Sequence, residues 1–88
     1  MGFEFDSGKS KSNRQKHGID FVEAQRMWES PNLEFHSKNE AEPRLLVIGI
    51  IDDVHWTAIV TYRGESTRII SVRRSRDEEK EVYRRNYR

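Results

Sequence analysis

The sequence contains no cysteine, which excludes disulfide bonds and thiolate metal sites. It also has no apolar run long enough for a signal peptide or a membrane span, so we expect a cytoplasmic protein without a membrane partner. The chain has 88 residues. This length predicts a single domain, residues 1–88, with a small hydrophobic core.

Motifs for several common chemistries are missing as well. His17, His36 and His55 are scattered, and none has a second histidine at the spacing that metal ligands need. Phosphate-binding glycine loops, dinucleotide fingerprints and a glycine-flanked nucleophile are absent too. We therefore expect neither a metal site nor a cofactor.

Charge is distributed unevenly along the chain. Basic residues outnumber acidic ones in residues 1–19 and 54–88, whereas acidic residues dominate residues 20–53. A basic surface concentrates polyanions, and an acidic surface repels them or docks a basic protein. The pattern is weak evidence alone, because the segments can fold next to each other and cancel.

The clearest structural signal is a β-hairpin that ends in several arginines. Residues 56–62 and 67–72 are rich in aromatic and β-branched side chains, which favour strands. Arg63-Gly64-Glu65-Ser66 lies between them and supplies turn chemistry, with a glycine for positive φ.

Strict alternation along these strands predicts two different faces. One face of the first strand is apolar and should point to the core: Trp56, Ala58, Val60 and Tyr62. The other face of the hairpin should carry hydroxyls and arginines, interrupted by Ile59 and Ile69: Thr57, Thr61, Arg63, Ser71 and Arg73. Arg68 belongs by parity to the apolar set, so its head should reach water or a carboxylate at the sheet end. We expect a phosphate to bind the polar face.

Three further strands are expected. Phe3–Asp6 alternates apolar and polar residues, as a short edge strand does. Residues 33–36 can form another, and Ser37–Pro43 is a charged loop. Residues 44–52 form a nearly unbroken apolar run, typical of a central strand covered on both faces. With a turn at Asp52-Asp53, these strands predict an antiparallel meander that continues through residues 67–74.

Two helices are expected before the meander. Residues 8–17 favour a helix, with Asp6 or Ser7 as its cap and Gly18 at its end, but they contain no large apolar side chain. Such a helix is either a basic face for RNA or a partner, or a solvated and fraying segment. A second helix starts at Asp20 and carries an apolar stripe, which we assign to the core: Phe21, Ala24, Met27 and Trp28.

A third helix follows the meander. Ser75 and Glu78 fit a capping box, and acids in the first turn complement the helix dipole. The sequence thus predicts an α+β fold with an antiparallel β-sheet, two N-terminal helices and one C-terminal helix.

Metal-free RNA cleavage is a chemistry that these residues can support. Attack of a 2′-hydroxyl on its phosphate needs a base, a donor for the leaving oxygen, and cations where charge grows. Arginine suits the last role because its planar donors match phosphate oxygens. Glu79 or His17 can be the base, and Tyr83 or an arginine the donor. The alternative is structural: Glu79 pairs with Arg76 or Lys80, and Tyr83 packs on the sheet.

The sequence resembles the BrnT family of type II toxins. The residues that carry the resemblance are Phe3 to Asp6, Lys16 to Phe21 with Glu23 and Ala24, Arg63-Gly64, Arg68 to Arg74, Glu79 and Tyr83. The chain departs from the family pattern where FEFD lacks a tryptophan before the aspartate and where Val72 replaces an alanine.

This resemblance implies a RelE-like fold and an endoribonuclease that arrests translation. It also implies two kinds of partner: an RNA substrate, and a BrnA-like antitoxin with a DNA-binding ribbon-helix-helix element. The complex of toxin and antitoxin would bind operator DNA through the antitoxin and repress its own operon.

Residues and resemblance together give two sets of site candidates. The expected catalytic residues are Arg63, Arg73, Glu79, Tyr83 and His17. The expected RNA-binding residues are Arg68, Arg74, Ser71 and Lys16. Two alternatives stay open: a binding module that holds nucleic acid or a protein partner without catalysis, and a purely structural subunit.

Overall fold

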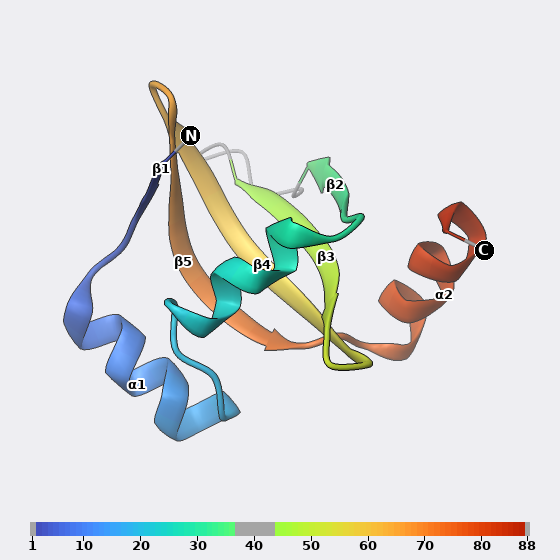
Figure 1. Ribbon diagram of the computed structural model, residues 1–88, viewed down its shortest axis with the longest axis horizontal. Coiled ribbons are helices and arrows are strands. Elements are labelled where there is room, and N and C mark those ends of the chain that lie inside the picture. The colour runs from blue at the N-terminus through green and yellow to red at the C-terminus, as the bar shows by residue number, and fades with distance from the viewer. Residues whose placement is uncertain (1, 37–43, 88) are drawn as a thin grey trace.

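A computed structural model describes residues 2–36 and 44–87, which form a five-stranded mixed sheet with helices on both faces (Figure 1). The charged loop expected at Ser37–Pro43 lies outside the described residues. In chain order the elements are β1 (Gly2–Glu4), α1 (Ser7–His17), η1 (Glu23–Glu29), β2 (Leu33–His36), β3 (Leu45–Ile51), β4 (Val54–Arg63), β5 (Ser66–Arg74) and α2 (Asp77–Asn86). The strand order across the sheet is β1-β5-β4-β3-β2.

The expected meander is confirmed, but the sheet is not wholly antiparallel. Strands β2 to β5 pair antiparallel in sequence order, whereas β1 pairs parallel with β5. Alternation in Phe3–Asp6 indicated an edge strand but carried no information on its direction. The middle position belongs to β4, and β3 lies between β4 and β2.

The hydrophobic core lies between the sheet and η1, which crosses one face of it (Figure 1). Phe21, Ala24 and Met27 are fully buried there, as the apolar stripe predicted, and Trp28 is partly buried against them. A Cβ on Gly49 would lie 3.2 Å from the Met27 carbonyl oxygen. Glycine in β3 therefore lets η1 approach the sheet closely.

The second expected helix is a 3₁₀-helix. The Asp20 carboxylate accepts a hydrogen bond of 2.8 Å from the Glu23 backbone N–H, although the N-cap position of the helix is Val22. The Gln25 N–H then bonds to the Val22 carbonyl at 3.2 Å, the tighter i to i+3 pattern. Apolar spacing alone did not distinguish this geometry from an α-helix.

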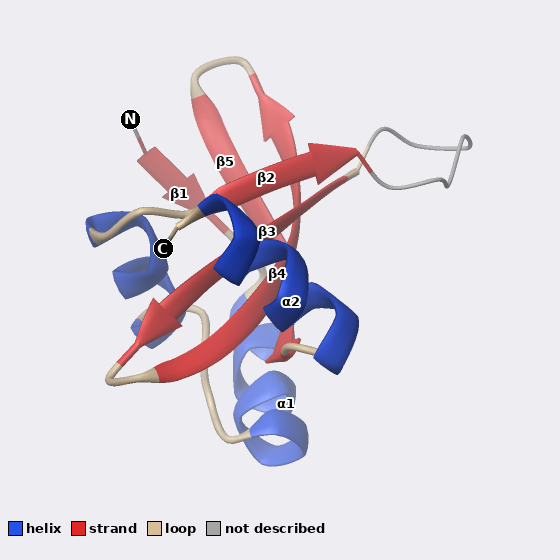
Figure 2. Cartoon of the chain, turned by 90° about the vertical axis from the view of Figure 1, so that its right-hand side faces the viewer, coloured by secondary structure: helices blue, strands red, loops and turns tan. Residues whose placement is uncertain are grey.

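Helix α2 packs on the opposite face of the sheet from η1 (Figure 2). It begins at Asp77, and the Arg76 backbone N–H donates to the Glu79 carboxylate at 2.8 Å. The capping box expected from Ser75 and Glu78 is therefore wrong by one residue. Ser75 is not the cap because its hydroxyl bonds to Thr57 inside the protein, at 2.7 Å.

A β-bulge in the hairpin changes which side chains share a face. Ile59 pairs with Ser71, but Val60 pairs with Ile69, so Ile70 is an extra residue in β5. Ile69 consequently turns into the core, where it is 1% exposed. Arg68 pairs with Thr61 and belongs to the polar face, which corrects the expectation from strict alternation.

Candidate functional site

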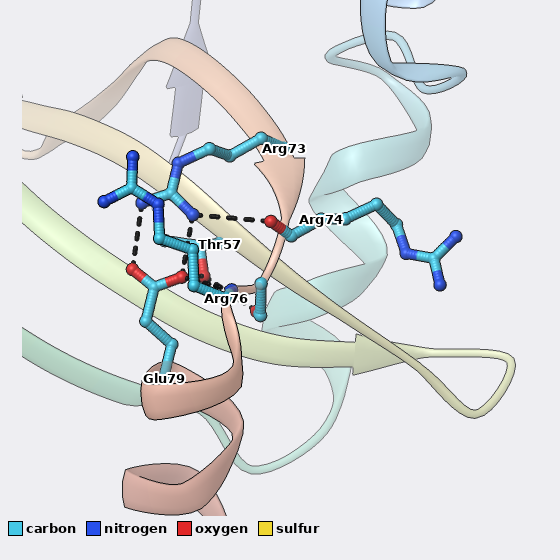
Figure 3. Close-up of polar contacts among 6 residues, drawn as sticks. Thr57, Arg73, Arg74, Arg76 and Glu79 are labelled. Carbon is cyan, nitrogen blue, oxygen red and sulfur yellow. Dashed lines mark hydrogen bonds and ion pairs between the residues drawn. The ribbon is translucent and has the colours of Figure 1, made fainter.

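The Glu79 carboxylate, on the first turn of α2, accepts hydrogen bonds from several elements (Figure 3). Arg73 donates to both of its carboxylate oxygens, at 2.7 and 2.9 Å. The Thr57 hydroxyl donates at 3.0 Å and the Arg76 backbone N–H at 2.8 Å. Glu79 is 7% exposed, so these hydrogen bonds, rather than water, compensate its negative charge.

These contacts determine the ionisation of the pair. Burial alone would raise the pKa of Glu79, but hydrogen bonds from Arg73, the Arg76 backbone and Thr57, with the charge of Arg73, outweigh it and lower the pKa to about 2. The same hydrogen bonding raises the pKa of Arg73. A carboxylate with so low a pKa is a weak proton acceptor near neutral pH. Geometry therefore favours Glu79 as the partner that positions Arg73.

Two arginines of the polar face meet at the hairpin end of the sheet. The Arg68 guanidinium lies 3.4 Å from the Glu4 carboxylate, which confirms the expected carboxylate partner, and Arg63 lies 3.9 Å from the same oxygen. The same carboxylate oxygen of Glu4 thus contacts both cations. Arg68 and Arg73 are separated by about 16 Å along β5, so the hairpin arginines do not form a single cluster.

Arg74 and Tyr83 lie apart from these groups. The Arg74 guanidinium sits 5.6 Å from the centre of the Trp56 ring and points away from Arg73 (Figure 3). The Tyr83 hydroxyl donates to the Pro31 carbonyl at 2.7 Å, and burial raises its pKa. Its ring packs edge-on against His55. Tyr83 therefore fastens α2 to the chain before β2.

Three of the expected site residues, from two distant segments, line one hollow between α1 and β5. Lys16 and His17 come from the end of α1, and Ser71 comes from β5 next to the bulge. The hollow has a volume of about 270 Å³. Its complete lining is Lys9, Ser12, Asn13, Lys16, His17, Ile70 and Ser71.

Lys9 and Ser12 were missed from the sequence, although a signal for them exists. Lys9, Ser12 and Lys16 recur at helical spacing and share one side of α1. Because α1 has no apolar stripe, nothing in its pattern indicated which side faces the sheet. The structure shows that buried polar side chains hold it: Ser10 accepts a hydrogen bond from Phe21 at 2.9 Å, and Asn13 bonds to β5.

Within residues 2–36 and 44–87, no three histidine, aspartate or glutamate side chains gather as ligands for a metal ion. None of the helices in those ranges combines the length and the apolar character needed to cross a membrane.

Fold and contacts together define a small α+β protein that places cationic side chains on a mixed sheet and on the helix beside it. The family model of the ribonuclease toxin BrnT, of type II toxin-antitoxin systems, matches residues 5–79, and the chain belongs to this family. None of the curated proteins compared with the chain matches it.

Membership in this family gives the general function, that of a ribonuclease toxin with an RNA substrate and an antitoxin partner. The matched residues include every site candidate except Tyr83, which lies beyond them.

Proposed function

We propose that the protein is a metal-independent endoribonuclease with a RelE-like fold that cleaves RNA in the cytoplasm and inhibits translation. The hollow between α1 and β5 supports this best, because it brings Lys16, His17 and Ser71 together from distant parts of the chain. Two lysines there, Lys9 and Lys16, supply positive charge for a phosphate backbone.

The residues divide the work as follows. His17 exchanges protons with the reacting hydroxyl or the leaving oxygen, since histidine is the side chain that most readily does so near neutral pH. Ser71 donates a hydrogen bond to the phosphate. Arg63 and Arg68 bind the RNA backbone at the hairpin end of the sheet, and Arg73 adds positive charge at the other end of β5.

Glu79 and Tyr83 take supporting roles in this mechanism. Glu79 orients Arg73, and Tyr83 fastens α2, because the hydrogen bonds of both side chains are directed to the protein itself. Arg74 contributes to RNA binding from the opposite face of the sheet, beside Trp56.

The partner that neutralises the toxin is a BrnA-like antitoxin with a ribbon-helix-helix element, through which the complex reaches operator DNA. Inducible expression with and without a gene for a BrnA-like antitoxin tests this. Expression alone should stop translation and produce new RNA ends, and co-expression should prevent both. Unchanged growth with unchanged RNA ends would contradict the proposal.

A second candidate is a module that binds RNA without cleaving it. The ionised, fully bonded Glu79 and the engaged Tyr83 hydroxyl favour it, because both are poorly placed to move protons. Binding through phosphate contacts alone predicts an affinity that falls steeply with salt, and no shortened product.

A further inference from the structure

The groups that surround the Glu79 carboxylate form a set of donors that suits a phosphate. Arg73 presents two parallel N–H groups to two oxygens, at 2.7 and 2.9 Å, the fork geometry with which arginine binds carboxylates and phosphates alike. The Arg76 backbone N–H adds a donor at the N-terminus of α2, where the helix dipole favours an anion. The Thr57 hydroxyl adds a fourth.

The backbone positions of two of the donor residues are fixed by the sheet, independently of Glu79. Thr57 and Arg73 are direct partners on β4 and β5, and Thr57 is fully buried. The single proton of the Thr57 hydroxyl goes to Glu79, so the 2.7 Å contact with Ser75 requires Ser75 to donate. We call Thr57, Arg73 and the Arg76 backbone N–H the anion cradle.

A second hollow, between α2 and the sheet, borders Glu79. Its volume is about 510 Å³, and it is lined by three apolar side chains and four polar or charged ones: Phe35, Leu46, Val82, His36, Arg76, Glu78 and Glu79. Val82 remains 37% exposed. Helix α2 thus leaves open space beside the Glu79 side chain.

We propose that the cradle is an anion-binding site occupied by the protein's own Glu79, and that an RNA phosphate competes with this carboxylate. Helix α2 is then autoinhibitory, because its Glu79 carboxylate blocks the anion site. In the described part of the chain, side-chain hydrogen bonds from α2 and its cap to other elements come from Glu79, Tyr83 and Tyr87. Loss of the hydrogen bonds to Glu79 therefore releases the first turn of α2 from the sheet. The identity of the ligand as RNA rests on the proposed function, whereas the existence of the site does not.

The first experiment uses inorganic phosphate as the probe and thermal unfolding of the full chain as the readout. Glu79→Ala empties the cradle, so phosphate should raise its unfolding midpoint saturably, by about 5 °C at several times the dissociation constant. The double variant with Arg73→Ala should lose this response. A Glu79→Ala response no larger than that of the wild type, or one that survives Arg73→Ala, would overturn the proposal.

The second experiment uses Glu79→Gln, which keeps the shape of the side chain and is expected to fold even if Glu79→Ala does not. Arg73 then loses its charged competitor, so a short single-stranded RNA should bind about 3 to 10 times more tightly, with a salt slope steeper by about 0.7. Glu81→Gln is the matched control, since it removes the same charge from an exposed position farther along the same helix. Equal effects of the two variants would overturn the competition.

The two arms also separate this inference from the proposed function. Saturable phosphate binding to Glu79→Ala, in a protein that neither binds nor cuts RNA, would support the cradle and refute the ribonuclease mechanism. RNA cleavage by the wild type, with no phosphate response in Glu79→Ala, would refute the cradle alone.

Discussion

The side-chain amide of Asn13 completes the backbone hydrogen bonding of Val72, 59 residues away in the sequence. Its nitrogen donates to the Val72 carbonyl at 2.9 Å, and its oxygen accepts from the Val72 N–H at 3.1 Å. Strand β1 pairs with β5 only as far as Arg68, so Asn13 takes the place of a neighbouring strand beyond it. A third bond, to the Ile19 carbonyl at 2.8 Å, fixes the chain after α1.

Asn13→Ala should therefore be strongly destabilising. It leaves the buried backbone groups of Val72 and Ile19 without partners, at a cost of about 3 kcal/mol in the free energy of unfolding. Urea denaturation measures this directly. Lys11→Ala, at an exposed position on the same helix, is the control and should change stability by less than about 0.5 kcal/mol. Equal stability of the two variants would show that Asn13 does not hold α1.

The low pKa of Glu79 predicts an acid-sensitive fold. Its pKa is about 2 in the folded protein, against an ordinary value of 4.5. Because the folded-state pKa is the lower one, the stabilisation is complete above the unfolded value and is lost as pH falls from about 5 to about 2. The wild type should lose on the order of 2 kcal/mol more than Glu79→Gln over this range. Parallel pH profiles of unfolding for the two proteins would contradict the strong Glu79–Arg73 pair.

Thr67→Val should stabilise the protein. Thr67 is 1% exposed in β5, and its hydroxyl oxygen has no hydrogen-bond partner among the described residues. Valine has nearly the same shape and removes the cost of burying that hydroxyl, so we expect a gain of about 1 kcal/mol. A higher midpoint in urea checks the prediction. Destabilisation would indicate that the hydroxyl is bonded in solution.

Asp53→Gly should also stabilise the protein, by about 0.5 kcal/mol. Asp52 and Asp53 both have positive φ, 49° and 67°, in the two-residue turn between β3 and β4. Glycine adopts this conformation without strain. Asp52→Gly is the matched control and should not gain, because Asp52 is held by Arg26 through two hydrogen bonds of 3.0 and 2.8 Å. Thermal unfolding of both variants makes the comparison, and a gain only in Asp52→Gly would reverse this interpretation.

Alanine substitutions of Arg73 and Arg63 should differ in their effect on the stability of the fold. Arg73→Ala leaves the buried Glu79 charge without its partner, so the variant should be destabilised whatever its activity. Arg63→Ala removes a side chain that is 59% exposed and should leave the fold intact. Urea denaturation followed by circular dichroism, before any RNA assay, separates the two effects, and an Arg73→Ala protein as stable as the wild type would contradict the strength of the pair.

Local signals in the sequence were enough to predict the hairpin, the turn at Asp52-Asp53 and both ends of α1. Each depends on neighbouring residues, as with the Asp6 cap and the left-handed Gly18 of α1. The family was also predicted correctly, because its motifs are read directly from the chain.

The rest depends on contacts between distant residues. Alternation misplaced Arg68 and Ile69 because a bulge at Ile70 has no distinct sequence signature. The hydrogen bonds of Asn13 to β5 could not be predicted, because the sequence does not show that β5 lies beside α1. Glu79 was expected to act as a base or to pair with Arg76 or Lys80, because only the assembled sheet brings Thr57 and Arg73 around it.

The rate of RNA cleavage in the presence of a chelator tests the proposed site most directly. The wild type and Lys11→Ala should produce discrete fragments at similar rates, whereas the double variant Lys16→Ala and His17→Ala should be slower by about 100-fold or more while remaining folded. Intact RNA with the wild type, cleavage only after a divalent metal is restored, or undiminished cleavage by the double variant would contradict a metal-independent site between α1 and β5.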